Sequence, residues 1–374
     1  MTAHGLPDLT QLFLLNSMKR IRVLVADDSA LMRRTLRYVI ESDPELELVG
    51  AARDGDDVVQ KARELKPDVI SMDINMPKTD GITALQIILN ENICPVVMLS
   101  SLTQRGATTT FECLELGAFD YVGKPDGTVS SDLGSVAREL ILKLKAAAGV
   151  GTLQRTGRQR RERREEIIRT KPTLAGTDFD RLKQGTTFKA IAIGISTGGP
   201  ATIMEVLPQI PRDIHGVVFL VQHMPVTFTN TFARRLNDAC ELEVAEVEPG
   251  MEVQAGHCYV ARGDAHLTLY RKLTGQVFIR MPTTPQTLFV PSVNVMMESV
   301  LAVYGRDTIG VLMTGIGDDG ADQMARIKQT GGYTIAESEE SCVVYGMPRE
   351  VIERGAACEV KPSWEIARAI LRRL

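Results

Sequence analysis

A serine in a glycine-rich turn is the first feature of this sequence that could carry out chemistry. The segment Gly194-Ile195-Ser196-Thr197-Gly198 has the pattern G-x-S-x-G, whose small residues allow a sharp turn from a strand into a helix that exposes the serine. The start of such a helix offers N–H donors and a positive dipole end to a developing oxyanion. The pattern indicates a nucleophile of acyl transfer. Such turns also bind phosphate, and a dinucleotide site would need glycine in place of Ser196.

A nucleophilic serine needs a base, and His223 is the histidine best placed to be one. It directly follows a strand predicted at 217–221, and the carboxyl ends of parallel strands meet at one edge of a sheet. Isolated histidines are more often structural, but this placement favours a base. The orienting acid is expected after a strand at 309–313, where either Asp318 or Asp319 could hold the imidazole. The other histidines lie in the tail, before the 217–221 strand or in a β-rich stretch: His4, His215, His257 and His266.

A second set of polar residues could bind a cation and a phosphoryl group. Asp27 and Asp28 follow the first predicted strand, Asp73 ends the third, Ser100 ends the fourth, and Lys124 follows the fifth. Converging carboxylates repel each other unless a divalent cation neutralises them, and an oxygen-rich half-shell suits Mg²⁺. A hydroxyl and a lysine opposite would hold phosphoryl oxygens. Any one acid could be a helix N-cap, but five converging residues predict a phosphorylation site.

The elements that must position these residues alternate between strand and helix in two regions. In the first, we expect strands at 21–25, 46–51, 69–73, 96–100 and 119–122, and helices at 29–40, 56–65, 83–89, 107–116 and 135–145. In the second, we expect strands at 190–195, 217–221, 309–313 and 333–336, β structure with turns at 242–280, and helices after 199 and at 228–236, 293–304, 319–329, 349–354 and 364–374. Such alternation predicts two doubly wound, parallel-sheet α/β domains, flavodoxin-like and Rossmann-like.

The remaining segments have a different character. Residues 1–18 are expected to be an N-terminal extension, and residues 141–186 a basic linker rich in arginine and glutamate with few apolar side chains. No aromatic residue is interleaved in the arginine-rich part, which disfavours a nucleic-acid-binding arm. The predicted domains are therefore 19–140 and 187–374.

Composition excludes several classes of protein. The 374 residues carry a formal charge of −4, with 44% hydrophobic and 24% charged residues, as in ordinary soluble domains. No apolar run is long enough for a membrane span or a signal peptide. The six cysteines show no C-x-x-C spacing, which is typical of idle thiols in a reducing cytoplasm.

The segments VLVADDS, DINMPKTDG, VVMLSS and YVGKP resemble the receiver domain of bacterial response regulators over about residues 20–140. The resemblance implies that Asp73 accepts a phosphoryl group from a partner histidine kinase of the chemotaxis type. It implies these further roles: Asp27, Asp28 and a main-chain carbonyl near Asn75 as Mg²⁺ ligands, Ser100 and Tyr121 as switch residues, and Lys124, before a cis bond to Pro125, as a phosphoryl contact.

The segments ISTGGP, QHMP, MTGIGDDGA and SCVVYGMP resemble the catalytic domain of the chemotaxis protein-glutamate methylesterase family over about residues 187–374. The resemblance implies Ser196 as nucleophile, His223 as base and Asp319 as acid, in the chain order Ser, His, Asp. It also implies that Thr197 positions His223, with Gly198 in the turn and Ile316, where relatives have Met, near the oxyanion. Val290 and Asn294 depart from the family's commoner Arg and Asp, which could change receptor preference.

These resemblances imply a phosphorylation-activated, cytoplasmic serine hydrolase. It would demethylate glutamyl methyl esters and deamidate glutamines on methyl-accepting chemoreceptors, with Mg²⁺ for receiver phosphorylation, no cofactor for the esterase reaction, no membrane insertion and no DNA. Three alternatives are weaker: a catalytically silent regulator that docks on receptors, a DNA-binding response regulator, and a dinucleotide-dependent oxidoreductase. The second would need a helix-turn-helix or a basic C-terminal domain.

Overall fold

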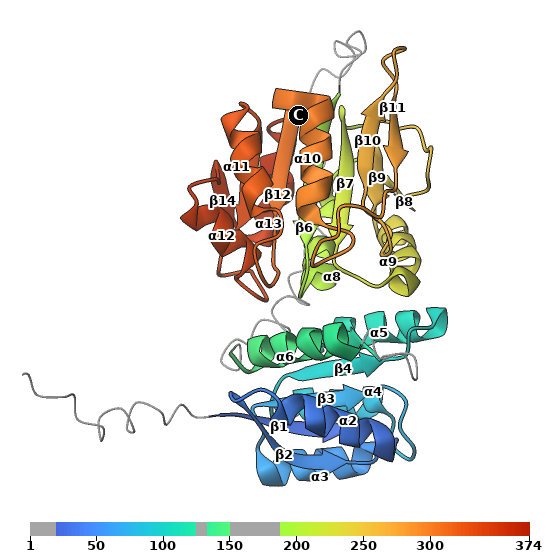
Figure 1. Cartoon of the computed structure of the whole chain (residues 1–374), viewed down its shortest axis with the longest axis vertical. Coiled ribbons are helices and arrows are strands. Elements are labelled where there is room, and N and C mark those ends of the chain that lie inside the picture. Colours follow the sequence, from blue (N-terminus) through green and yellow to red (C-terminus); the bar gives the residue numbers. More distant parts are fainter. Residues whose placement is uncertain (1–19, 125–132, 150–187) are drawn as a thin grey trace, which may run out of the picture. The chain divides into compact units, whose positions relative to one another are not determined.

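The structure is a computed structural model that describes residues 20–124, 133–149 and 188–374 (Figure 1). Within these ranges the chain forms two α/β units, each around its own parallel sheet, and a separate two-stranded hairpin. The predicted fold class is confirmed. The predicted N-terminal extension and most of the predicted linker lie outside the described residues.

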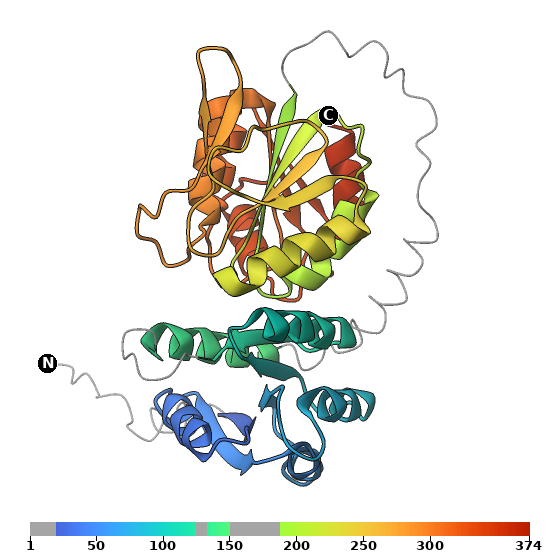
Figure 2. The ribbon, with the colours of Figure 1, turned by 90° about the vertical axis from the view of Figure 1, so that its right-hand side faces the viewer.

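The first sheet has five strands in the order β2-β1-β3-β4-β5. Its strands are β1 (Ile21–Ala26), β2 (Leu46–Ala52), β3 (Val69–Asp73), β4 (Val96–Ser100) and β5 (Asp120–Gly123). Its helices are α2 (Ala30–Glu41), α3 (Gly55–Leu65), α4 (Gly81–Asn90), α5 (Gln104–Leu116) and α6 (Leu133–Gly149). Figure 2 shows α2 and α6 on one face of this sheet and α3 and α4 on the other.

Burial explains the sequence pattern of the central strands in the first sheet. Every residue of β3 and β4 is buried, so both strands are mostly apolar on both faces rather than alternating. The buried polar residues of these strands are Ser71, Asp73 and Ser100. Four helices begin at side-chain caps, each of which accepts a hydrogen bond from a backbone N–H of the first turn: Ser29, Asp54, Asp80 and Thr103. The strand order reverses between β1 and β3, and ligands of such sheets bind in the crevice at that point.

The second sheet has seven strands in the order β14-β13-β12-β6-β7-β9-β8, all paired in parallel. Its strands are β6 (Lys189–Ile195), β7 (Gly216–Gln222), β8 (Glu243–Glu246), β9 (His257–Val260), β12 (Thr308–Leu312), β13 (Tyr333–Glu337) and β14 (Glu359–Lys361). The hairpin consists of β10 (Thr268–Arg271) and β11 (Val277–Arg280). The order reverses between β6 and β12, and ligands of such sheets bind at the carboxyl ends of the strands at that point.

Helices cover both faces of the second sheet. Figure 2 shows α10 on one side of it and α9 and α13 on the other. The helices and helical turns are α8 (Gly199–Thr202), η2 (Ile203–Glu205), η3 (Leu207–Gln209), α9 (Val226–Ala239), α10 (Val293–Tyr304), η4 (Gly305–Asp307), α11 (Ala321–Gln329), α12 (Met347–Glu353) and α13 (Ser363–Leu371). No helix in the described ranges is long and apolar enough to cross a membrane.

Three expectations about the elements need correction. The helix after Gly199 is a single turn, α8, followed by 3-10 turns, so the macrodipole expected behind the serine is small. Helix α11 begins at Ala321 rather than Asp319, because Gly320 is its N-cap with a φ of 101°. Helix α6 extends to Gly149, so residues 141–149 are helical rather than linker. Their apolar spacing continues the buried stripe of Leu140, Leu144 and Ala147.

Candidate functional site

Ser196 lies directly after the central strand β6, in the turn that leads to α8. The Ser196 N–H donates to the carbonyl of Thr314 at 2.9 Å, and the Gly199 N–H closes the turn on the Ser196 carbonyl at 2.8 Å. Gly198 has a φ of 76°, and a Cβ there would lie 2.3 Å from the side chain of Val343. Only glycine satisfies both conditions. The G-x-S-x-G segment thus forms a sharp turn.

His223 directly follows β7, which pairs in parallel with β6, the strand that precedes Ser196. The register places Ile195 opposite Gln222, so the residues that come next, Ser196 and His223, are neighbours. The imidazole Nδ1 lies 3.1 Å from the Ser196 Oγ. The buried amide of Gln222 donates to the carbonyls of both Ser196 and His223, each at 3.0 Å. This amide ties the two main chains together.

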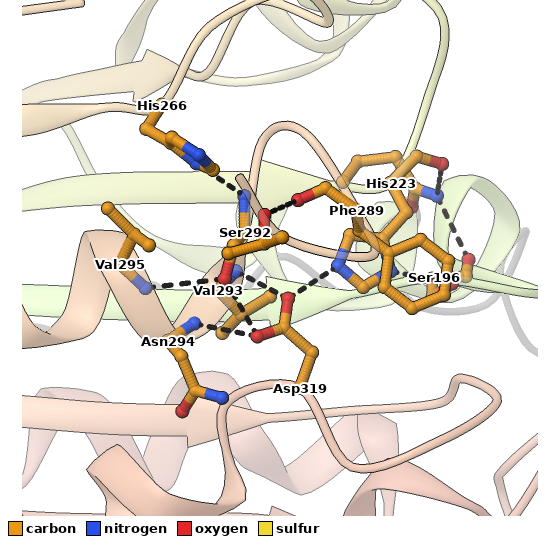
Figure 3. Close-up of polar contacts among 11 residues, drawn as sticks. Ser196, His223, His266, Phe289, Ser292, Val293, Asn294, Val295 and Asp319 are labelled. Carbon is orange, nitrogen blue, oxygen red and sulfur yellow. Dashed lines mark hydrogen bonds and ion pairs between the residues drawn. The ribbon is translucent and has the colours of Figure 1, made fainter. Parts of the chain in front are cut away.

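Asp319 completes a chain of hydrogen bonds from the loop between β12 and α11. Its Oδ2 lies 2.8 Å from the Nε2 of His223 (Figure 3). The carboxylate also accepts from the Ser292 hydroxyl at 2.9 Å and from the backbone N–H groups of Val293 at 2.7 Å and Asn294 at 3.0 Å. The start of α10 therefore forms a cradle of donors around this acid.

The donors around Asp319 keep its carboxyl group ionised. Burial by itself raises the pKa of this carboxyl group. The hydrogen bond and charge of His223, with the backbone donors of Asn294 and Val293, outweigh that effect and hold the pKa below its ordinary value. Asp319 is therefore an anion at neutral pH, which is the state that can stabilise an imidazolium.

The contacts of the His223 ring fix its tautomer. An ionised Asp319 can only accept, so Nε2 carries the proton and Nδ1 is left with a lone pair facing Ser196. A ring flip would put carbon atoms at both places, so the assignment follows from where the two partners lie. The arrangement can remove a proton from the Ser196 hydroxyl through Nδ1.

The sequence left Asp318 and Asp319 as alternatives for the acid, and the structure brings only Asp319 to His223. The side chain of Asp318 is 67% exposed and forms an ion pair with Arg354 at 3.1 Å. Asp318 therefore belongs to the surface.

Phe289 is a residue of the site that sequence reasoning missed. Its ring stacks on the imidazole of His223, with centroids 4.1 Å apart and planes at 11° (Figure 3). Phe289 precedes the segment 290–294, in which the sequence departs from the commoner family pattern, and that departure was the available signal. The stack covers one face of the base.

The structure shows the neighbours of two of the supporting residues, Thr197 and Ile316. In the described part of the chain, no hydrogen bond joins the Thr197 hydroxyl to His223. The Thr197 carbonyl instead accepts from the hydroxyl of Thr314 at 2.9 Å, and Gln222 makes the link to His223. Ile316 is half-buried and follows Gly315, where a Cβ would lie 2.8 Å from the Ser196 Cβ. This close approach of Gly315 to Ser196 shows that the turn that carries Ile316 lies against the nucleophile.

The sequence predicted a carboxylate cluster in the first sheet, and three of its acids lie together. Asp27 and Asp28 follow β1, and Asp73 ends β3. One oxygen of each lies within 4.8 Å of the others, with Asp27 and Asp73 buried and Asp28 exposed. Three carboxylates at this spacing match the oxygen ligands that Mg²⁺ prefers. The residues present fit a magnesium ion.

The other expected residues of this cluster lie on neighbouring elements. Asn75 is exposed two residues after Asp73. Ser100 ends β4 and is fully buried, and its hydroxyl accepts from that of Thr110 at 2.6 Å. The Lys124 N–H donates to the Ser100 carbonyl at 2.7 Å. Tyr121 lies on β5 and is 3% exposed. The cis bond expected before Pro125 lies outside the described residues.

Both α/β units of the chain match known protein families. A family model described as CheB methylesterase matches residues 191–370, and one described as response regulator receiver domain matches residues 23–129. A protein-glutamate methylesterase/protein-glutamine glutaminase of Syntrophomonas wolfei is 56% identical over 356 residues, which are 94% of this chain and 99% of the relative. One of Carboxydothermus hydrogenoformans is 50% identical, over 95% of this chain and 99% of the relative. The crystal structure of the Thermotoga maritima CheB methylesterase catalytic domain is 37% identical, and the match covers 50% of this chain and 100% of that chain with a TM-score of 0.49.

Proposed function

The chain belongs to the family of protein-glutamate methylesterases/protein-glutamine glutaminases that carry a receiver domain, and we propose that Ser196, His223 and Asp319 carry out its reaction. The observation that carries this proposal is the unbroken chain of hydrogen bonds from the Ser196 Oγ through both nitrogens of His223 to Asp319, at 3.1 and 2.8 Å. The substrates are glutamyl methyl esters and glutamines on methyl-accepting chemoreceptors.

The first half of the reaction forms an acyl-enzyme. The Ser196 Oγ attacks the ester carbonyl carbon as its proton passes to the Nδ1 of His223, and Asp319 stabilises the imidazolium. The tetrahedral intermediate then collapses, its bond to the methoxy oxygen breaks, and Nδ1 returns the proton so that methanol leaves. For a glutamine the leaving group is ammonia.

The second half returns the enzyme to its starting state. A water molecule gives one proton to Nδ1 of His223 as its oxygen attacks the acyl carbon. The intermediate then collapses, its bond to the Ser196 Oγ breaks, and Nδ1 returns the proton to Ser196. The released glutamic acid side chain gives the second proton of the water to solvent and becomes a carboxylate. Backbone N–H groups of Thr197 and of the turn at Ile316 are the proposed oxyanion donors, because both lie beside the nucleophile. Replacement of the family's Met by Ile316 leaves a backbone donor in place.

The first sheet supplies the control of this activity. We assign Asp73 as the phosphoacceptor, with Ser100, Tyr121 and Lys124 responding to the phosphoryl group. Asp27, Asp28, Asp73 and a carbonyl near Asn75 would hold Mg²⁺, which neutralises phosphoryl charge when bound. A histidine kinase of the chemotaxis type is the proposed phosphodonor, and the cytoplasm the proposed compartment. The receiver is taken to include α6 and the catalytic domain to begin near residue 188.

Methanol release from methylated receptor tests the catalytic assignment. The full chain and its Ser196→Ala variant are compared, with Ser341→Ala as a matched control, because Ser341 is also a buried serine of the second unit but bonds to Glu337. Ser196→Ala should abolish methanol release and Ser341→Ala should retain most of it. Equal activity of wild type and Ser196→Ala would overturn the assignment, and an inactive wild type would instead favour the silent docking alternative.

A further inference from the structure

His266 is a second histidine beside the active site, and no step of the reaction uses it. It lies just before β10 and is fully buried. We propose that His266 is a positioning residue of the esterase: one ring nitrogen fixes the chain that holds Asp319, and the other fixes the loop that carries Phe289. This inference rests on the proposed function, because it concerns how the same site is held in shape.

The partners of the His266 ring determine which nitrogen carries the proton. The backbone N–H of Ser292 lies 3.1 Å from Nδ1 and can only donate, so Nδ1 is an unprotonated acceptor (Figure 3). Nε2 lies 2.9 Å from the carbonyl of Pro285, which can only accept, so Nε2 carries the proton. The ring is therefore a neutral imidazole with a separate task for each nitrogen.

The Nδ1 contact leads to the catalytic acid. Ser292 is the N-cap of α10, and its hydroxyl together with the next two backbone N–H groups makes three of the hydrogen bonds to Asp319. His266 accepts from the backbone N–H of this same Ser292. A shift of the helix start would move the carboxylate relative to His223, and misplacement by about 1 Å can cost 10²-fold in rate. Nδ1 therefore acts on catalysis through Ser292 and Asp319.

The Nε2 contact leads to the loop over His223. The backbone N–H of His266 donates to the carbonyl of Pro282 at 2.8 Å, and the Nε2 of its ring donates to the carbonyl of Pro285. Residues 283–288 of this loop are exposed, so the loop depends on contacts along its inner side. Phe289 follows them and stacks on His223. The Nε2 contact therefore affects Phe289, which covers one face of His223, and does not affect Asp319.

Two amide substitutions separate these tasks. Asparagine reaches about as far as Nδ1 and can offer its oxygen to the Ser292 N–H, whereas glutamine reaches about as far as Nε2 and can offer its NH₂ to Pro285. In the full chain we expect His266→Asn to keep kcat on methylated receptor within about threefold of wild type. We expect His266→Gln to lower kcat at least about tenfold with little change in KM. Similar falls in both variants, or in neither, would overturn the inference.

A second measurement distinguishes positioning from a general role in stability. The rate at which a serine-directed phosphonate labels Ser196 is measured for His266→Gln in the wild-type background and in Asp319→Asn. Because His266→Gln removes the Nδ1 contact, which acts through Asp319, it should slow labelling at least about fivefold in the first background and less than twofold in the second. A residue that only stabilises the fold would slow labelling in both, and that result would refute the proposal.

The labelling assay needs no receptor, so it separates this inference from the proposed function. If wild type reacts with the phosphonate but releases no methanol from methylated receptor, the proposed function is wrong and the His266 comparison still decides the inference. If wild type does both and the two His266 backgrounds respond alike, the inference is wrong and the proposed function stands.

Discussion

The two sites lie at equivalent places in two similar sheets, but the surroundings of their carboxylates differ. Both lie at the carboxyl ends of strands where the strand order reverses, between β1 and β3 in one sheet and β6 and β12 in the other. In the second sheet, one carboxylate, Asp319, is surrounded by four donors of the protein. In the first, three carboxylates lie within 4.8 Å of one another.

This difference separates an enzyme site that is ready when folded from a switch that needs further ligands. Asp319 has its charge satisfied by the chain itself, so the proton path from Ser196 through His223 exists without any added group. Asp27, Asp28 and Asp73 bring like charges together, and a divalent cation from solution would offset that repulsion. The comparison predicts that loss of the cation or of Asp73 removes only the control by phosphorylation and leaves the esterase rate of the unphosphorylated protein intact.

The largest effect is expected from Asp319→Asn. The neutral amide cannot stabilise the imidazolium as a carboxylate does, and it no longer fixes the His223 tautomer. The kcat for receptor demethylation should therefore fall by about 10⁴-fold. The matched control is Asp318→Asn, which changes the neighbouring acid on the surface and should stay within about twofold. Stopped assays of methanol release measure both. Equal losses in the two variants would contradict the assignment of Asp319.

The second prediction concerns chelation and the receiver. EDTA or Asp73→Asn should abolish incorporation of phosphate from a small-molecule phosphodonor and every increase in esterase rate that depends on it, because the carboxylates then lack a cation or an acceptor. The rate without phosphodonor should stay within about twofold, since the hydrogen bonds from Ser196 through His223 to Asp319 join protein groups. A phosphonate-labelling assay on EDTA-treated protein checks this. Loss of labelling by EDTA would show that the two sites are not independent.

The sequence was sufficient to predict most of the helices and strands and the functional residues at the strand ends. Strands that are buried on both faces, such as β3, are mostly apolar, and Asp73 is the last residue of that strand. Ser196 and His223 could be brought together for the same reason, because they directly follow neighbouring parallel strands. Glycine at 198 pointed to the turn, since few other residues tolerate its backbone.

Contacts that depend on loops could not be predicted. The choice between Asp318 and Asp319 depends on where α11 begins, and propensity does not set that boundary within a residue or two. Phe289 and His266 lie in irregular segments, where no period of two or 3.6 residues indicates which side chains face inward. The link from His266 to Asp319 requires the backbone of Ser292, and a backbone N–H leaves no signal in the sequence.

A smaller effect is expected where the protein covers its own catalytic base. Phe289→Ala removes the stacking partner of His223, and aromatic stacks contribute about 0.5–1.5 kcal/mol, so kcat should fall by about two- to tenfold. Leu288→Ala is the control, because that side chain is 80% exposed and should change kcat by less than about twofold. Phe289→Tyr should restore most of the rate. A Phe289→Ala variant as active as wild type would show that the stack has no part in positioning His223.

The smallest effect is the contribution of Asp319 to stability, and its sign follows from the direction of its pKa. Folding holds the pKa of Asp319 below its ordinary value, so the folded state binds this proton less readily than the unfolded chain. The stabilisation is fully present above the ordinary carboxyl pKa of about 3.9 and is lost as the pH falls through the lower folded pKa. The urea midpoint of wild type should therefore exceed that of Asp319→Asn at pH of about 6, and the gap should shrink as the pH falls below about 4. Other carboxylates titrate in both proteins, so the gap isolates this one, and a gap that stays constant with pH would mean that the donors at the start of α10 do not act on the charge of Asp319.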